Sequence, residues 1–261
     1  MRRLIFLILN LFAFLFLSTP LSAGNIETAE EILAASDAVR NPDRPYSLNT
    51  LLIEYRDGRE QGRMALTVYS KEMKQSGEYR SLIRFVEPAR DKDKLMLING
   101  NILWFYDPSS KRSVRISPQQ RLMGQASNGD VVTVNFHNDY AAKLEGEETI
   151  TDTEKKARAC YRLNLQAVDT SITYHRIEYW VDKENFHPVK GKFYSESDRL
   201  LKIVYYRGYR EQLGKMRPTE VIIIDGVDRK LVTKMLFSDY SYRVIPEEWF
   251  QEEYLLHFKG E

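Results

Sequence analysis

Hydrophobic and polar residues alternate with a period of two along most of the chain after residue 45. This period is typical of β-strands, in which successive side chains point to opposite faces. It indicates strand after strand over residues 48–116 and again over residues 161–237, separated by short runs of turn-forming residues. We count about ten or eleven strands. A sheet of this size must curl, close or split, so we expect a strongly curved, unclosed antiparallel β-barrel.

Residues 94–117 are predicted to form a meander of three short strands, because Asn99-Gly100 and Asp107-Pro108 are turn-forming pairs. The middle strand is apolar on both faces. Its side chains point in two directions, Ile102, Trp104 and Tyr106 to one side and Leu103 and Phe105 to the other. Such a strand must be covered on both faces. One cover is the core of the fold, and the other is either helices or a bound apolar guest.

Three segments depart from the period of two. Residues 26–39 show helical spacing, with acidic residues in the first half, where the helix dipole favours them. Residues 119–138 are polar and contain glycine, which predicts a loop with a short strand or helical turn and the most mobile segment of the chain. Residues 246–248 begin a short C-terminal helix. Its apolar side would hold Trp249, Phe250 and Leu255.

The first 23 residues have the pattern of a secretory signal peptide. Arg2 and Arg3 precede an apolar run over residues 4–17, and small residues follow up to Ala23, where we expect cleavage. The alternative is a membrane anchor, but this run is shorter than the roughly 20 residues that span a bilayer. No cysteine follows the run to carry a lipid. We therefore predict a periplasmic or secreted protein that is not lipid-anchored, with a single domain over residues 24–261.

Charge and composition exclude several classes of function. Cleavage would remove two arginines and change the formal net charge from +1 to −1. Basic and acidic residues are interspersed, which argues against a nucleic-acid partner. Cys160 is the only cysteine, so an intramolecular disulfide and a cysteine metal cluster are excluded. The four histidines show no metal-ligand spacing, and we expect neither a metal nor a cofactor. No catalytic motif is present, although a Ser-His-Asp site assembled through space stays open.

Several short motifs together resemble a known family. In chain order they are Phe85-Val86-Glu87-Pro88, Leu95-Met96-Leu97, Trp104-Phe105-Tyr106-Asp107-Pro108, Arg115-Ile116, Gly129-Asp130, Asp139-Tyr140, Trp180-Val181-Asp182 with Pro188, and Leu201-Lys202. Their order and spacing are similar to those of the outer-membrane lipoprotein-sorting family, related in fold to LolA and LolB, and closest to its uncharacterised LolA-like branch. The resemblance implies an unclosed, curved antiparallel β-barrel with helices over its hollow. It also implies a role in carrying lipidated or lipid cargo across the periplasm.

A carrier of this kind needs an apolar hollow under a movable cover. We predict that seven side chains line the hollow: Met64, Leu66, Ile83, Phe85, Leu97, Trp104 and Tyr106. The predicted covers are residues 26–39 and residues 122–136. The partners would be acylated lipoprotein or lipid cargo, an inner-membrane transporter of the resistance-nodulation-division type that some LolA-like relatives accompany, and an outer-membrane acceptor. Two alternatives stay open: an interaction or assembly module that binds protein on the concave sheet, and a periplasmic hydrolase.

Overall fold

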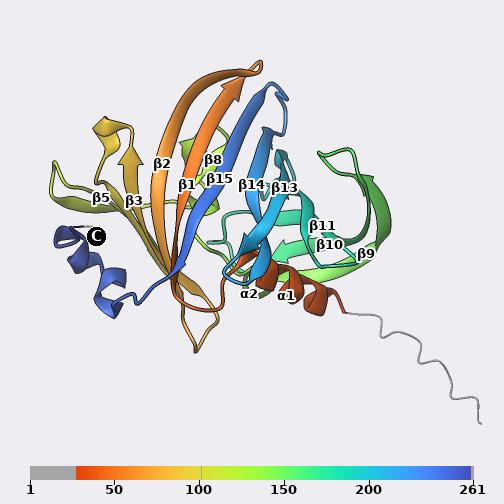
Figure 1. Cartoon of the computed structure of the whole chain (residues 1–261), viewed down its shortest axis with the longest axis horizontal. Coiled ribbons are helices and arrows are strands. Elements are labelled where there is room, and N and C mark those ends of the chain that lie inside the picture. The colour runs from red at the N-terminus through yellow and green to blue at the C-terminus, as the bar shows by residue number, and fades with distance from the viewer. Residues whose placement is uncertain (1–27, 101, 260–261) are drawn as a thin grey trace, which may run out of the picture.

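The computed structural model describes residues 28–100 and 102–259. Thirteen strands form one antiparallel sheet in the order β6-β5-β4-β3-β2-β1-β15-β14-β13-β12-β11-β10-β9. Figure 1 shows that this sheet is strongly curved, with α1 at its lower end. Within the described residues the terminal strands β6 and β9 do not pair with each other, so the barrel is unclosed, as predicted.

Most strands are joined to their neighbours in sequence. Their bounds are β1 (Tyr46–Arg56), β2 (Arg59–Glu72), β3 (Tyr79–Glu87), β4 (Leu95–Asn99), β5 (Ile102–Asp107), β6 (Arg112–Ile116), β9 (Tyr140–Thr151), β10 (Ala157–Ala167), β11 (Arg176–Asp182), β12 (Pro188–Tyr194), β13 (Leu200–Gln212), β14 (Lys215–Asp225) and β15 (Leu231–Tyr242). A separate hairpin consists of β7 (Arg121–Met123) and β8 (Ala126–Ser127). The first strand, β1, pairs with the last strand, β15, near the middle of the sheet.

The helices are few and short. They are α1 (Ala29–Arg40), α2 (Phe136–Asp139) and four 3-10 turns, η1 (Ala89–Asp91), η2 (Asn128–Asp130), η3 (Glu247–Phe250) and η4 (Glu252–Leu256). Thr28 caps α1, and Glu31 completes a capping box with it. Helices are too short or too polar to cross a membrane throughout the described part of the chain.

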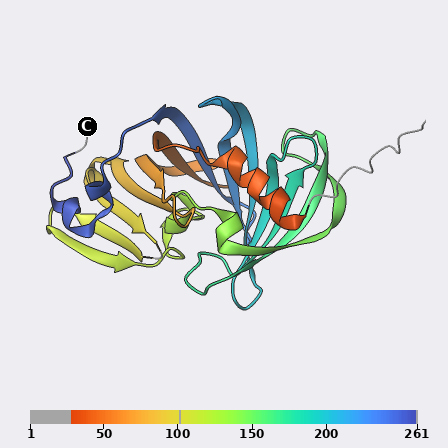
Figure 2. The same ribbon diagram turned by 90° about the horizontal axis from the view of Figure 1, so that it is seen from below.

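The inner face of the curved sheet carries the main core. Alternate residues of each strand point inward, among them Leu66 on β2, Ile83 on β3 and Leu103 on β5. Ile32 and Leu33 of α1 pack on the same core. The segment between β6 and β9, which includes the β7–β8 hairpin, η2 and α2, also lies on this side (Figure 2).

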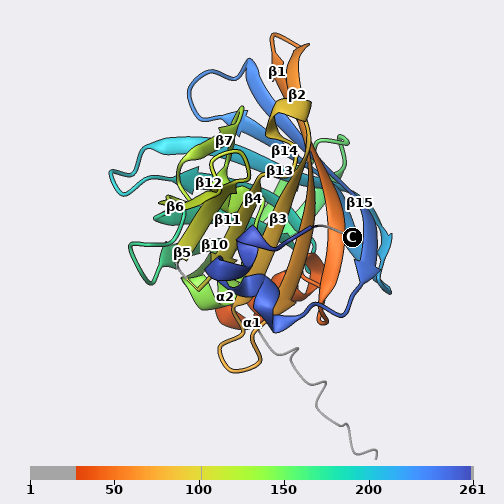
Figure 3. The ribbon, with the colours of Figure 1, turned by 90° about the vertical axis from the view of Figure 1, so that its left-hand side faces the viewer.

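A second core lies on the outer face of β2–β5. Tyr69, Leu82, Leu95, Leu97 and Tyr106 pack there against the C-terminal segment, which contributes Ile245, Phe250 and Leu255. Figure 3 shows η3 and η4 lying in front of these strands. The middle strand β5 is therefore covered on both faces, as its sequence predicts, and the outer cover is the protein's own C-terminal segment.

The structure also departs from the predicted elements. The sheet has thirteen strands rather than ten or eleven. The sequence pattern missed β9, whose outward residues are charged because it is an edge strand open to water. The predicted C-terminal helix is instead the two 3-10 turns. Residues 1–27, which include the predicted signal peptide, the start of the domain and the start of the helix, lie outside the described residues, as do Asn101 and residues 260–261.

Candidate functional site

A hollow of about 160 Å³ lies between the inner face of the sheet and the segment that follows β8. Its walls on the sheet side are mostly apolar: Leu48, Val68, Phe193, Val204, Val221, Ile223, Met235 and Phe237. On the other side it is closed by Val131, Val132, Val134 and Phe136. The hollow is thus a space between two layers that do not fully interdigitate, rather than a cleft on the surface.

Hydrogen bonds hold the closing segment, residues 128–136, against both α1 and the sheet. The Asn41 side-chain amide, just after α1, donates to the Val134 carbonyl oxygen at 2.8 Å. The hydroxyls of Tyr46 and Thr133 lie 2.7 Å apart. At Gly129 a Cβ atom would lie only 2.2 Å from the Thr173 hydroxyl oxygen, so glycine allows the close approach of the two loops. The segment is therefore held at several points along its length.

Charged groups border the hollow where α1 meets α2. Arg40 forms an ion pair with Asp37, and its guanidinium lies 4.0 Å from the centre of the Phe136 ring. The backbone N–H of His137 donates to the Asp37 carboxylate at 2.7 Å. Asp139 also lines the hollow. Burial, together with the neighbouring carboxylates of Glu78 and Asp37, raises the pKa of Asp139 to about 7.

A buried ion pair ties the closing segment to the sheet on its other side. Lys202 of β13 is 3% exposed, and its ammonium binds the Asp130 carboxylate at the end of η2. The Tyr174 hydroxyl donates to the same carboxylate at 2.8 Å, and the Ser127 backbone N–H donates to it at 2.7 Å. Burial lowers the pKa of Lys202, whereas Asp130 opposes that shift.

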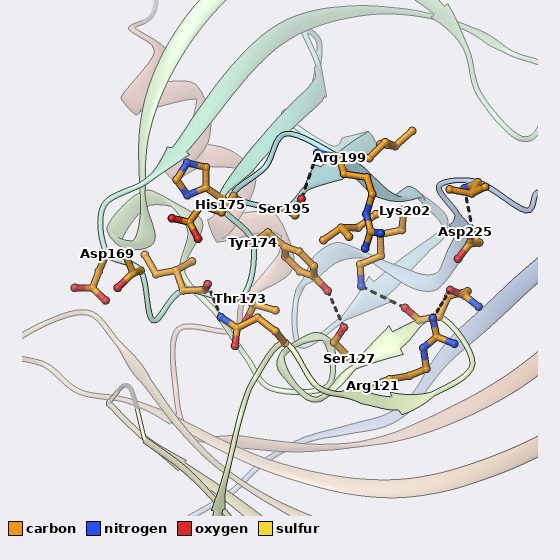
Figure 4. A pocket seen from close by; sticks show the side chains of 18 residues that line it. Arg121, Ser127, Asp169, Thr173, Tyr174, His175, Ser195, Arg199, Lys202 and Asp225 are labelled. Atoms are coloured by element: carbon orange, nitrogen blue, oxygen red, sulfur yellow. Dashed lines mark hydrogen bonds between the residues drawn. The ribbon is translucent and has the colours of Figure 1, made fainter.

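This ion pair lies beside a polar groove of about 520 Å³, shown in Figure 4. The groove is formed by the β7–β8 hairpin, by the loop of residues 169–175, by the loop between β12 and β13 with the start of β13, and by the end of β14 with the loop that follows it. Arg121, His175, Arg199 and Lys202 line it together with carboxylates and hydroxyls. Tyr174 belongs to the walls of both the groove and the hollow.

The structure separates the seven predicted lining residues into two sets. Met64, Leu66, Ile83 and Phe85 lie on the inner face, whereas Leu97, Trp104 and Tyr106 lie on the outer face under the C-terminal segment. The two sets therefore do not share one hollow, and none of the seven borders the hollow described above. That they contact a ligand stays a prediction. The hollow lies nearer the middle of the sheet, on β1, β2 and β12–β15.

The two predicted covers do lie over the inner face. α1 packs on the inner core, and residues 131–136 close the hollow. Sequence reasoning gave no role to Lys202, Asp130 or Asp139, although each belongs to a motif that carries the family resemblance. The available signal was the position of Lys202, which is in phase with Val204 on the inner face of an otherwise apolar strand.

Metal-binding side chains do not gather in the described residues: no group of three or more His, Cys, Asp or Glu is placed to hold an ion. Cys160 is buried, and burial raises the pKa of its thiol to about 12. Its place is a small outer-face cluster with Ile150, Trp180 and Val189, so it is a packing residue.

Comparison with solved structures identifies the fold. A LolA superfamily protein from Nitrosomonas europaea is 33% identical, with a TM-score of 0.78 over 87% of this chain and 99% of that one. A Vibrio parahaemolyticus domain described as an outer membrane lipoprotein-sorting protein is 19% identical, with a TM-score of 0.74 over 87% of this chain and 98% of the other. A DUF1329 family protein from Desulfovibrio piger is 22% identical, with the same TM-score over 87% and 97% of the two chains.

Comparison of sequences adds one further match. A family model described as an uncharacterized protein matches residues 77–257. No curated protein matches the chain. The similarity to the Nitrosomonas europaea protein covers most of this chain and nearly all of that one. The chain belongs to the LolA superfamily.

Proposed function

We propose that this protein is a periplasmic carrier that binds acyl chains of lipoproteins or lipids and moves them towards the outer membrane. The observation that carries the proposal is the apolar hollow between the curved sheet and residues 131–136. The lipoprotein-sorting relatives and the signal-like pattern of residues 1–23 support the same role. An inner-membrane transporter as donor and an outer-membrane acceptor would complete the transfer.

Energetics define what the hollow must do. Each CH₂ group moved from water to an apolar site contributes about 0.8 kcal/mol, or roughly 12 kcal/mol for a sixteen-carbon chain. The hollow of about 160 Å³ matches the cavity of about 150 Å³ that holds one benzene molecule in another protein. In this conformation it therefore has room for about six carbons. A longer chain enters only when residues 131–136 move away from the sheet.

Partial burial of the chain suits a carrier, because an acceptor must be able to remove the cargo. The polar ties of the closing segment, such as Asn41 to Val134 and Tyr46 to Thr133, must break when the segment opens. Each such neutral hydrogen bond contributes about 1 kcal/mol net. Opening also uncovers the buried side chains of Val131, Val132 and Phe136, and the transfer energy of the entering chain must offset that cost.

The test is lipid extraction and mass spectrometry of protein purified from the periplasm, combined with uptake of a fluorescent fatty acid. We expect co-purifying phospholipid or acylated protein, and a large loss of uptake in Val221→Phe, which fills the hollow. Val168→Phe is the matched control, because Val168 is 63% exposed and lies outside the hollow. Protein free of lipid that takes up no fatty acid would contradict the proposal and favour the interaction-module alternative.

A further inference from the structure

The groove and the hollow are neighbouring spaces with different chemistries. Ile172, Thr173 and Tyr174 line both spaces, so a single loop separates a polar compartment from an apolar one. A volume of about 520 Å³ is within the usual range for small-molecule sites. A molecule with a polar head and an apolar tail could therefore place each end in a matching environment across Tyr174.

The groove has cationic side chains with hydrogen-bond donors to spare. The Arg199 guanidinium forms neither a hydrogen bond nor an ion pair with the described residues, and Arg121 makes only a 3.5 Å contact with the Gln125 side-chain oxygen. Figure 4 shows Arg121, Arg199 and Lys202 on one side of the groove, away from Asp169 and His175. Guanidinium groups present paired N–H donors that match the oxygens of phosphate.

Two carboxylates of the groove, Asp169 and Asp225, already accept hydrogen bonds from the protein. Asp169 accepts from the Ser171 backbone N–H at 2.7 Å, and Asp225 accepts from the backbone N–H groups of Val227 and Asp228, both at 2.8 Å. Asp130 is occupied by Lys202, Tyr174 and Ser127. Glu196 is exposed to solvent in its turn. One oxygen each of Asp169 and Asp225 is thus used within the protein, whereas the Arg199 guanidinium is not paired with the described residues, which favours an anion over a cation as the ligand.

We propose that this groove binds the phosphate headgroup of an anionic lipid whose acyl chain occupies the hollow. The inference rests on the proposed carrier function and adds the chemical class of the cargo. Arg121 and Arg199 bind the phosphate oxygens, and the charge of Lys202 lies behind them. Tyr174 marks the boundary at which the headgroup gives way to the chain.

Three probes separate the two halves of such a ligand. Palmitoyl lysophosphatidic acid carries both phosphate and chain, monopalmitoylglycerol carries the chain alone, and inorganic phosphate carries the headgroup alone. Each is titrated below its aggregation limit against the full mature protein, by displacement of a fluorescent fatty acid and by calorimetry. The same titrations at low and high salt report the electrostatic part of binding.

The variant is the double substitution Arg121→Gln/Arg199→Gln, and both side chains are exposed, so the fold should persist. Arg56→Gln/Arg59→Gln is the matched control, because it removes the same charge from exposed residues at the β1–β2 turn, away from the groove. We expect about a tenfold or greater loss of lysophosphatidic acid affinity in the groove variant only, with monopalmitoylglycerol unchanged. Thermal unfolding checks that both variants are folded.

The other outcomes each overturn a defined part. Equal affinity for lysophosphatidic acid and monopalmitoylglycerol, unaltered in the groove variant, would reject the headgroup site and leave the carrier function standing. Inorganic phosphate that binds as tightly as lysophosphatidic acid and depends on the same arginines would assign the groove to a free anion instead of a lipid. Failure of both lipids to bind the wild-type protein would reject the carrier function and the headgroup site together.

Discussion

The outer face of β2–β5 and the inner face of β12–β15 are both apolar, yet they are closed in different ways. The outer face packs directly against Ile245, Phe250 and Leu255, and the two tryptophans Trp104 and Trp249 pack on the edge of this cluster. The inner face meets residues 131–136 with a space of about 160 Å³ between the layers. The charged groups that border this space are buried or half-buried. Those that border the outer cluster include the surface carboxylate of Glu247, which pairs with Lys71 and Arg80.

The difference shows that an abundance of apolar side chains does not by itself mark a binding site. Strands β4 and β5 within residues 94–117 are rich in apolar side chains, and both of their faces are covered by other parts of the protein. The hollow instead lies where the cover is a loop held by polar contacts and a buried ion pair. Substitutions that loosen the outer cover should therefore lower stability and leave ligand binding unchanged.

We expect the largest loss of stability for Phe250→Ala on the outer face. Phe250 is 1% exposed, and loss of a buried phenylalanine side chain costs about 3–5 kcal/mol through lost burial and the cavity left behind. Fatty-acid uptake should be unchanged, because the hollow is on the opposite face. Urea unfolding measures the loss, and tryptophan fluorescence should shift to the red as Trp104 and Trp249 gain contact with water.

Leu256→Ala is the control for this prediction, since Leu256 is 54% exposed in the same segment and should change stability little. A folded Phe250→Ala protein that has lost uptake would mean that the two faces are coupled. The separation of packing and binding surfaces drawn above would then be wrong.

The sequence predicted local features well, because strand period is local. The opposite orientations of Leu103 and Trp104 on β5 follow from alternation alone, and the structure confirms them. The identity of each cover does not follow, because the outer one comes from residues about 150 positions away. Leu66 and Val68 share a face of β2, yet only Val68 borders the hollow, and that choice depends on how thirteen strands curve together.

The charged residues beside the hollow were the hardest to predict. Lys202 shares a face with Val204 on β13, but its partner Asp130 lies more than 70 residues away in a loop with no regular pattern. The edge strand β9 was missed for a related reason, since Glu145, Glu147 and Glu148 hide its period behind solvent-facing charge. Sequence periodicity thus locates buried layers, whereas pairing across loops requires the three-dimensional structure.

We expect the second largest loss of stability for Asp130→Asn, in the segment that closes the hollow. The substitution leaves the Lys202 ammonium buried without a counter-charge, which costs about 3 kcal/mol at neutral pH. Urea unfolding measures it. Asp198→Asn is the control, because Asp198 pairs with Arg176 while 71% exposed, and such surface pairs contribute little.

The pH dependence of the stability of the Asp130→Asn protein distinguishes loss of the counter-charge of Lys202 from loss of hydrogen bonds. Burial lowers the pKa of Lys202 below its unfolded value near 10.4, and loss of Asp130 lowers it further. As pH rises towards 10.4 the folded state releases this proton before the unfolded state does, so stability rises with pH in that window. The penalty of Asp130→Asn should therefore shrink at alkaline pH. A penalty that is constant with pH would point to lost hydrogen bonds of Tyr174 and Ser127 instead.

We expect the smallest change in stability for a substitution of Asp139, whose carboxylate lies beside the hollow. Among the described residues it forms no ion pair, unlike Glu247 on the outer side. Its pKa is raised to about 7, mainly by burial, from an ordinary value near 3.9. Between these values the folded state holds a proton that the unfolded state has lost, so this group makes stability fall as pH rises from about 4 to about 7. Asp139→Asn should remove that slope. It should stabilise the protein at pH 8 by on the order of 1–2 kcal/mol, with allowance for partial exposure, and should leave pH 4 unchanged. Urea unfolding at pH 4, 6 and 8 measures this.

Asp37→Asn is the contrasting variant, because it removes the ion-pair partner of Arg40 and should destabilise the protein at pH 8. If Asp139→Asn also destabilises there, the carboxylate is a paired structural group, and the hollow is closed as firmly as the outer face.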